Sequence, residues 1–399
     1  DTGKNRQITA ICHILFNRNI LPSDPFPKIS IACITTLRYT FIWIVHDTMQ
    51  HEFPLEYHEV PENQKTGYEM TKGERDLRPY IEGVLDCDRR MLAKTITLVE
   101  SSLQADQEAS RKILDALMPH TGKALRIGIT GLPGAGKSTF IESFGSMLTG
   151  KGYRVAVLAV DPSSPKTGGS ILADKTRMEK LAINEMAFIR PSPSGKTLGG
   201  VARKTRETML VCEAAGFEAV MIETVGVGQS EVTVSSMVDF FLVLMIAGGG
   251  DELQGMKKGV LELADAVAIN KADGDNVERA EIARRQYETA FHLLSPACLS
   301  WSPPVVTCSS ITTDGLDNIL KIILDHREKM TAGGELQKKR KEQDREWLKF
   351  MVREGVQEWF YNSPAAGVLA DSLREVETGL TTPTTAAAKV LDCLKGRKF

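Results

Sequence analysis

Seven short apolar runs between residues 125 and 310 dominate the pattern of the chain. Each run is rich in Val and Ile and nearly continuous in hydrophobicity, which is typical of strands covered by helices on both faces. The segments between the runs have the length of helices, so the pattern predicts an α/β domain with a mostly parallel sheet. The runs are LRIGIT, YRVAVLAVD, MAFIRP, EAVMIET, DFFLVLMIAG, DAVAINKAD and PPVVTCSS.

Helical patterns flank this domain. Residues 76–119 carry apolar positions at mixed three- and four-residue steps, and residues 334–360 alternate charged and apolar faces before a last helical pattern near the end. We therefore divide the chain into four parts. They are an extension of unknown role (1–75), an N-terminal helical segment (76–122), the α/β domain (123–330) and a C-terminal helical arm (331–399).

Composition narrows the classes of partner. The net charge of −2 gives no reason to expect nucleic acid or an anionic membrane surface. Seven cysteines without a C-x-x-C spacing argue against a disulfide framework and a Cys-based zinc site. The apolar stretch at 28–47 is interrupted by Arg38 and falls short of a full membrane span, so we expect no transmembrane helix there.

A glycine-rich segment follows the first predicted strand. Its sequence, GLPGAGKST, fits G-x-x-x-x-G-K-[ST], the pattern of a loop whose N–H groups surround nucleotide phosphates at a helix start. Lys137 is expected to reach the β- and γ-phosphates, and the Ser138 hydroxyl is expected to bind Mg²⁺. The predicted phosphate-binding residues are Gly131, Leu132, Pro133, Gly134, Ala135, Gly136, Lys137, Ser138 and Thr139.

The segment NKAD, residues 270–273, closes another predicted strand, where ligands gather in open α/β sheets. The Asp273 carboxylate can accept two hydrogen bonds from guanine N1–H and the 2-amino group, which adenine cannot supply. Asn270 and Lys271 are expected to brace the base and the loop. After the next strand, backbone groups of Ser309, Ser310 and Ile311 are expected to face the guanine oxygen.

Acids at strand ends supply the metal and catalytic candidates. We assign Mg²⁺ or water positioning to Asp161, Asp174 and Glu223, and a γ-phosphate contact to the Gly226 N–H. Asp174 also fits a solvated loop carboxylate or a helix cap. Val227 occupies the position after the glycine where Ras-like GTPases carry a water-orienting Gln, so we expect slow intrinsic hydrolysis. The predicted catalytic residues are Lys137, Asp161, Asp174, Glu223 and Gly226. The predicted metal ligands are Ser138, Asp161, Asp174 and Glu223.

Together, TGLPGAGKST, AVDPSSPKTGGSILADKTRM, FIRPSPS, ETVGVGQSE, GGGDELQGMKKG and NKADGDN resemble the methylmalonyl-CoA mutase-associated GTPases. That family includes bacterial mutase chaperones and the mitochondrial cobalamin A-type protein. The resemblance covers about residues 76–350 and implies a SIMIBI-like P-loop GTPase with a C-terminal helical dimerisation arm. It also implies a homodimer that acts on methylmalonyl-CoA mutase or a related mutase, with Mg²⁺ bound beside GTP and adenosylcobalamin carried by the partner.

The loop after the fifth run matches the family's third switch, which relays the nucleotide state to the partner. Its glycines allow hinge motion, and its polar side chains can change contacts between states. A capped helix start with solvated lysines is the alternative. The predicted switch residues are Asp251, Glu252, Gln254, Lys257 and Lys258.

Two other functions remain open at this point. A nickel insertase would need Cys or His clusters, whereas the seven His residues are scattered. A kinase of an arginine or ornithine transport system follows an older description of some family members. The resemblance places the protein in the cytoplasm if it is bacterial and in the mitochondrial matrix if it is eukaryotic.

Overall fold

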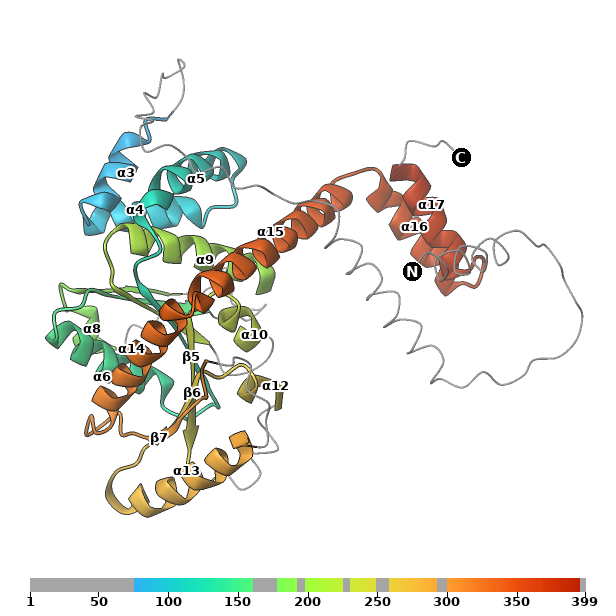
Figure 1. Ribbon diagram of the computed structural model, residues 1–399. Coiled ribbons are helices and arrows are strands. Elements are labelled where there is room, and N and C mark those ends of the chain that lie inside the picture. The colour runs from blue at the N-terminus through green and yellow to red at the C-terminus, as the bar shows by residue number, and fades with distance from the viewer. Residues whose placement is uncertain are drawn as a thin grey trace, which may run out of the picture. The chain divides into compact units, whose positions relative to one another are not determined.

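The computed structural model describes residues 75–160, 178–191, 198–224, 230–248, 258–292 and 300–394. The chain divides into two units, residues 1–70 and 71–399, and every described residue belongs to the second. Seven parallel strands form one sheet in the order β3-β2-β4-β1-β5-β6-β7 (Figure 1). The α/β prediction and the seven predicted strands are confirmed. The strands are β1 (Leu125–Gly131), β2 (Val155–Val160), β3 (Ala187–Arg190), β4 (Ala219–Thr224), β5 (Phe240–Ile246), β6 (Ala266–Asn270) and β7 (Val305–Thr307).

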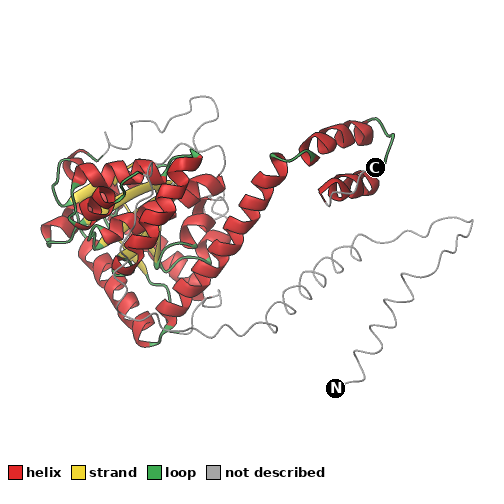
Figure 2. Ribbon diagram, turned by 90° about the horizontal axis from the view of Figure 1, so that it is seen from above, coloured by secondary structure: helices red, strands yellow, loops and turns green. Residues whose placement is uncertain are grey.

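Helices cover both faces of the sheet, as the view from above shows (Figure 2). Alternate residues of each strand enter two separate apolar cores, which explains why the runs are hydrophobic throughout. One core is closed by α6 (Lys137–Gly150), α8 (Glu179–Ala182) and α14 (Leu316–Ala332). The other is closed by α9 (Leu198–Ala214), α10 (Ser230–Ser235), α12 (Lys258–Leu261) and α13 (Val277–His292).

The flanking helical patterns also form helices. The N-terminal helices pack on α9, and Asp88 begins the second of them by accepting hydrogen bonds from the backbone N–H groups of Arg90 and Met91. None of the described helices is long and apolar enough to cross a membrane. The N-terminal helices are α3 (Arg78–Leu85), α4 (Arg89–Val99) and α5 (Gln104–Leu117), and the C-terminal ones are α15 (Glu335–Tyr361), α16 (Ala365–Glu377) and α17 (Pro383–Leu394). Two short 3-10 helices are η1 (Met118–His120) and η2 (Gly274–Asn276).

The beginning of α15 is anchored at the amino edge of the sheet. Arg340 pairs with Asp239 at 2.6 Å and donates a second hydrogen bond to the carbonyl of Gly122 at 2.5 Å. The Gly122 N–H in turn donates to Glu213 at 2.6 Å, and Glu213 forms a buried ion pair with Arg126 of β1. This network fixes the first turns of the C-terminal arm to the segment that leads into β1.

Candidate functional site

The phosphate-loop candidate connects β1 to α6 at the carboxyl edge of the sheet. A Cβ at Gly131 would lie 2.3 Å from the carbonyl oxygen of Leu244, so only glycine lets the chain leave β1 this close to β5. Gly136 has a φ of +87°, and a Cβ there would lie 2.9 Å from Asn270 Nδ2. These two close approaches explain why the loop requires glycine where the pattern places it.

Lys137 opens α6 and turns back across the loop. Its Nζ donates to the carbonyl of Gly131 at 2.8 Å and to that of Leu132 at 3.4 Å. Burial lowers the pKa of Lys137, and the carboxylates of Glu223 and Glu231 oppose that shift. The lysine is thus a half-buried cation inside a loop of backbone groups, an arrangement suited to a polyphosphate.

Ser138 and Glu223 lie together, although 85 positions separate them in the sequence. The Ser138 hydroxyl donates to Glu223 Oε1 at 3.1 Å, and Glu223 is buried at the end of β4. Mg²⁺ in phosphate sites takes one or two carboxylates or hydroxyls and completes its shell with phosphates and water. A hydroxyl and a carboxylate at hydrogen-bonding distance therefore fit this ion.

Asn270 joins the phosphate loop to the loop after β7. Its Nδ2 donates to the carbonyl of Ala135 at 2.8 Å, and its Oδ1 accepts from both the N–H and the hydroxyl of Ser310. Burial raises the pKa of the Cys308 thiol to about 12, so this group stays protonated and donates to the same Oδ1. One buried side chain thereby fixes the spacing between two loops that the sequence predicts on either side of a nucleotide.

The predicted base-side residues come together at the ends of β6 and β7. The Ser309 hydroxyl donates to Asp273 Oδ2 at 2.5 Å and accepts the backbone N–H of Ile311 at 3.2 Å. A carboxylate has about four acceptor positions, so Asp273 can still bind a further donor pair. Ile311 is 75% exposed.

The backbone N–H groups of this loop already have acceptors. That of Ser309 bonds the carbonyl of Asp314, that of Ser310 bonds Asn270, and that of Ile311 bonds Ser309. To contact a base, each of these N–H groups would have to share its hydrogen bond with the base or give up its present acceptor. The predicted backbone role of the three residues stays a prediction.

Sequence reasoning missed three features of this region, namely the conformation of Lys271 and the roles of Ser143 and Glu231. Lys271 was predicted, but its left-handed φ of 62° and the bond from Asn276 to its carbonyl were not. Ser143 of α6 donates to the Ser310 carbonyl at 2.6 Å, and Glu231 lies buried at the start of α10. The signal for Glu231 was present, because an acid ends the segment ETVGVGQSE three residues before the apolar Val234.

Several predicted site residues lie outside the described residues. Of the last predicted switch residue, Lys258, only its place as the first residue of α12 is described. The predicted residues outside the described ranges are Asp161, Asp174, Gly226, Asp251, Glu252, Gln254 and Lys257.

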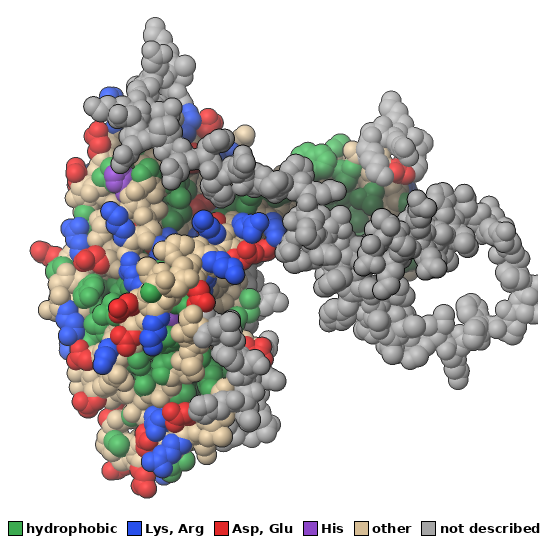
Figure 3. Space-filling view, viewed as in Figure 1, with side chains coloured by type: hydrophobic (Ala, Val, Ile, Leu, Met, Phe, Trp, Pro, Cys, Tyr) green, Lys and Arg blue, Asp and Glu red, His purple; other side chains and the backbone are tan. Residues whose placement is uncertain are grey.

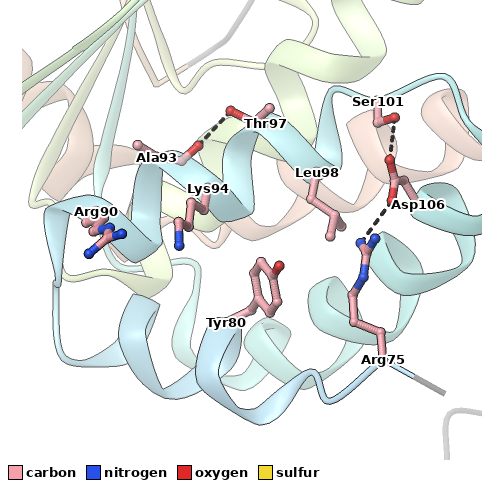
Figure 4. A pocket seen from close by; sticks show the side chains of 9 residues that line it. All are labelled: Arg75, Tyr80, Arg90, Ala93, Lys94, Thr97, Leu98, Ser101 and Asp106. Carbon is pink, nitrogen blue, oxygen red and sulfur yellow. Dashed lines mark hydrogen bonds and ion pairs between the residues drawn. The ribbon is translucent and has the colours of Figure 1, made fainter. Parts of the chain in front are cut away.

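A separate surface groove of about 620 Å³ lies among α3, α4 and α5 (Figure 4). Arg90 and Lys94 line it but are exposed, and Arg75 is already paired with Asp106 at 2.9 Å. Its charged groups are thus either solvated or paired. The groove contains no residue of the phosphate loop and gives no comparable indication of a ligand.

Comparisons with known proteins identify relatives that are named GTPases, as the phosphate loop leads one to expect. Residues 92–365 match the family model described as methylmalonyl Co-A mutase-associated GTPase MeaB. GTPase ArgK of Escherichia coli is 49% identical over 78% of this chain and 95% of its own length. The methylmalonic aciduria type A homolog, mitochondrial, of Mus musculus is 42% identical over 79% of each chain.

A solved structure, titled LAO/AO transport system kinase, is 40% identical with a TM-score of 0.65. The alignment covers 82% of this chain and 100% of that one. The family match spans well over half of the chain and includes the complete phosphate loop, Asn270 and Asp273. The chain therefore belongs to the MeaB family of methylmalonyl-CoA mutase-associated GTPases.

Proposed function

We propose that this protein binds and hydrolyses GTP, and that its nucleotide state gates delivery of adenosylcobalamin to methylmalonyl-CoA mutase or a related cobalamin-dependent mutase, which it also protects. The proposal of GTP binding rests on the Asn270 side chain, which links the phosphate loop to the loop after β7, where the base is predicted to bind. The family description supports the mutase as partner. The proposed cobalamin is carried by that partner and is not bound here.

Each site residue has a proposed role. The phosphate-loop N–H groups and Lys137 bind the phosphates, and Asp273 selects guanine. Mg²⁺ bound with the nucleotide would be held by Ser138 and Glu223, with Asp161 and Asp174 as further ligands, and would neutralise phosphate charge. Val227 stands directly after Gly226, where Ras-like GTPases carry a water-orienting Gln, which supports slow hydrolysis unless a partner assists.

The central experiment compares free phosphate released from GTP by the full chain alone and with purified methylmalonyl-CoA mutase. We expect slow basal release and a clear increase with the mutase. Transfer of adenosylcobalamin to apo-mutase, followed by absorbance, should depend on which nucleotide is bound. Radiolabel appearing on an acceptor protein instead of as free phosphate would support the transport-kinase alternative.

The predicted switch loop follows β5 in the sequence. Ile246, the last residue of β5, pairs with Asn270 of β6, the first residue of the NKAD segment. Gln254→Ala or Lys257→Ala should leave GTP affinity nearly intact, because the phosphate loop and Asp273 supply the main contacts. Coupling between sites is typically ~1–3 kcal/mol, so stimulation by the mutase should fall roughly fivefold to a hundredfold.

Basal and stimulated hydrolysis measured for each variant separate the two effects. Lys321→Ala, at an exposed position on α14, is the matched control and should keep full stimulation. Full stimulation in both loop variants would show that this loop is a helix cap with solvated lysines.

We also propose a homodimer formed through the C-terminal arm. Four apolar side chains of α15 recur at steps of four, four and three residues, which places them on one helix face. They are Leu348, Val352, Val356 and Trp359, exposed by 64%, 56%, 58% and 58%. Further exposed apolar side chains lie on the C-terminal helices, where Figure 3 shows a hydrophobic patch. A stripe of this kind calls for a partner surface, and a second copy offers an equal one.

Val352→Glu should convert the dimer to a monomer in analytical ultracentrifugation, because it places a charge in the centre of the stripe. Gln357→Glu adds the same charge on the opposite face of α15 and should leave the dimer intact. A wild-type chain that sediments as a monomer at micromolar concentration would contradict the proposed dimer.

A further inference from the structure

Glu231 is a buried carboxylate beside the phosphate loop for which the proposed mechanism has no role. It belongs to the first turn of α10 and is only 5% exposed. Its neighbour in the chain, Val232, is exposed, whereas Val234, three positions later, is fully buried. Residues three apart share a helix face, so Glu231 points toward the sheet with Val234.

The packing of Val234 shows where on the sheet that face lies. A Cβ at Gly128 of β1 would come within 2.9 Å of Val234 Cγ1, so α10 lies directly against β1 at this glycine. Since β4 and β5 are both parallel to β1, the helix between them runs back from the carboxyl edge of the sheet. Glu231 precedes Val234 by three helical residues, a rise of about 4.5 Å, whereas two strand residues span about 6.6 Å. On the face of β1 that α10 covers, Glu231 is therefore nearest to Thr130, the next residue after Gly128 on that face.

Thr130 is the last residue before the phosphate loop. It is buried, and its hydroxyl accepts a hydrogen bond from Thr224 at 2.8 Å. Glu231 therefore approaches the loop from the face opposite α6, the helix that Lys137 begins. The charges agree with this placement, because the Glu231 carboxylate acts together with Glu223 in opposing the effect of burial on the pKa of Lys137.

We infer that Glu231 competes with the γ-phosphate for the charge of Lys137, and so makes the position of α10 depend on whether GTP or GDP is bound. The inference rests on the proposed function of the phosphate loop. Lys137 donates to backbone carbonyls, and two buried carboxylates, Glu223 and Glu231, stabilise its charge. GDP brings only the β-phosphate to the lysine, whereas GTP adds the γ-phosphate, whose charge repels a nearby buried carboxylate. Displacement of Glu231 moves α10, because Glu231 belongs to its first turn.

The test is the ratio of affinities for a non-hydrolysable GTP analogue and for GDP, measured by titration of the full chain. Glu231→Gln keeps the shape and removes the charge, so it should tighten the GTP analogue by roughly five- to tenfold and change GDP by less than about twofold. Glu231→Asp keeps the charge and should retain a ratio near that of the wild type. A purely structural role would instead change both nucleotides together.

Hydrogen exchange of wild-type residues 230–238 gives a second measurement that does not depend on a variant folding. Their protection should differ between the GDP and GTP-analogue complexes. An unchanged affinity ratio in folded Glu231→Gln, or equal protection in the two complexes, would overturn the inference. A wild-type chain that binds neither nucleotide would overturn the proposed function instead, so the two failures are distinguishable.

Discussion

Lys137→Ala is expected to lower GTP hydrolysis by about 100- to 1,000-fold, the usual effect of removing one positioned electrostatic group from a transition state. The ammonium group lies within the loop formed by residues 131–136, where its donors now bind the carbonyls of Gly131 and Leu132. In the proposed complex these donors turn to the phosphates. Helix α6, which is described from Lys137 to Gly150, contains no second lysine or arginine, so the helix offers no neighbouring replacement.

Single-turnover release of phosphate from radiolabelled GTP measures this effect without interference from product release. Lys151→Ala is the matched control, since Lys151 follows the other end of α6 and pairs at 3.0 Å with Asp317, which is largely exposed. That variant should hydrolyse GTP at the wild-type rate. A near-normal rate in Lys137→Ala would mean that the phosphates bind elsewhere.

Asp273→Asn should weaken GTP binding by about 2–3 kcal/mol, or roughly 30- to 140-fold in Kd, because it removes the charged acceptor for two guanine donors. The substitution keeps the side-chain volume, and an amide oxygen can still accept the Ser309 hydroxyl that bonds Asp273 here. The loss should therefore come from the base and not from collapse of the loop.

A change of base separates these explanations. Xanthine carries an oxygen where guanine carries its 2-amino group, so the Asn amide can donate to it while the Asp carboxylate repels it. Titrations with GDP and xanthosine diphosphate should show that Asp273→Asn prefers the latter and the wild type the former. Loss of both nucleotides would indicate damage to the fold, and unchanged GDP affinity would remove Asp273 from the base site.

The strands could be predicted from the sequence because burial on both faces leaves a local mark, a continuous apolar run. The glycine-rich loop could also be predicted from a short stretch of sequence. Its glycines are required because the backbone passes close to neighbouring residues, such as Leu244 of β5, where β1 turns into α6. Helix α16 was not predicted as a separate element, although Ser363 and Pro364 before it and Gly379 after it are helix boundary signals.

Contacts between distant residues left no such mark. Ser143 meets Ser310 across 167 positions, and the anchor of α15 depends on Arg340 meeting Asp239 across 101. Both depend on how helices pack against the sheet, which a single sequence does not encode in its periodicity. Asn270 is an intermediate case. Its place in the nucleotide site was predicted from the NKAD segment, whereas its hydrogen bond to the Ala135 carbonyl could be found only in the folded structure.

Isothermal titration of the full chain with GDP and ADP, each with Mg²⁺, tests the guanine-nucleotide site most directly. The Asp273 carboxylate should favour GDP by roughly 30-fold or more, the effect of a paired charge-assisted contact that adenine lacks. Equal affinities for the two nucleotides, or binding of neither, would contradict the assignment.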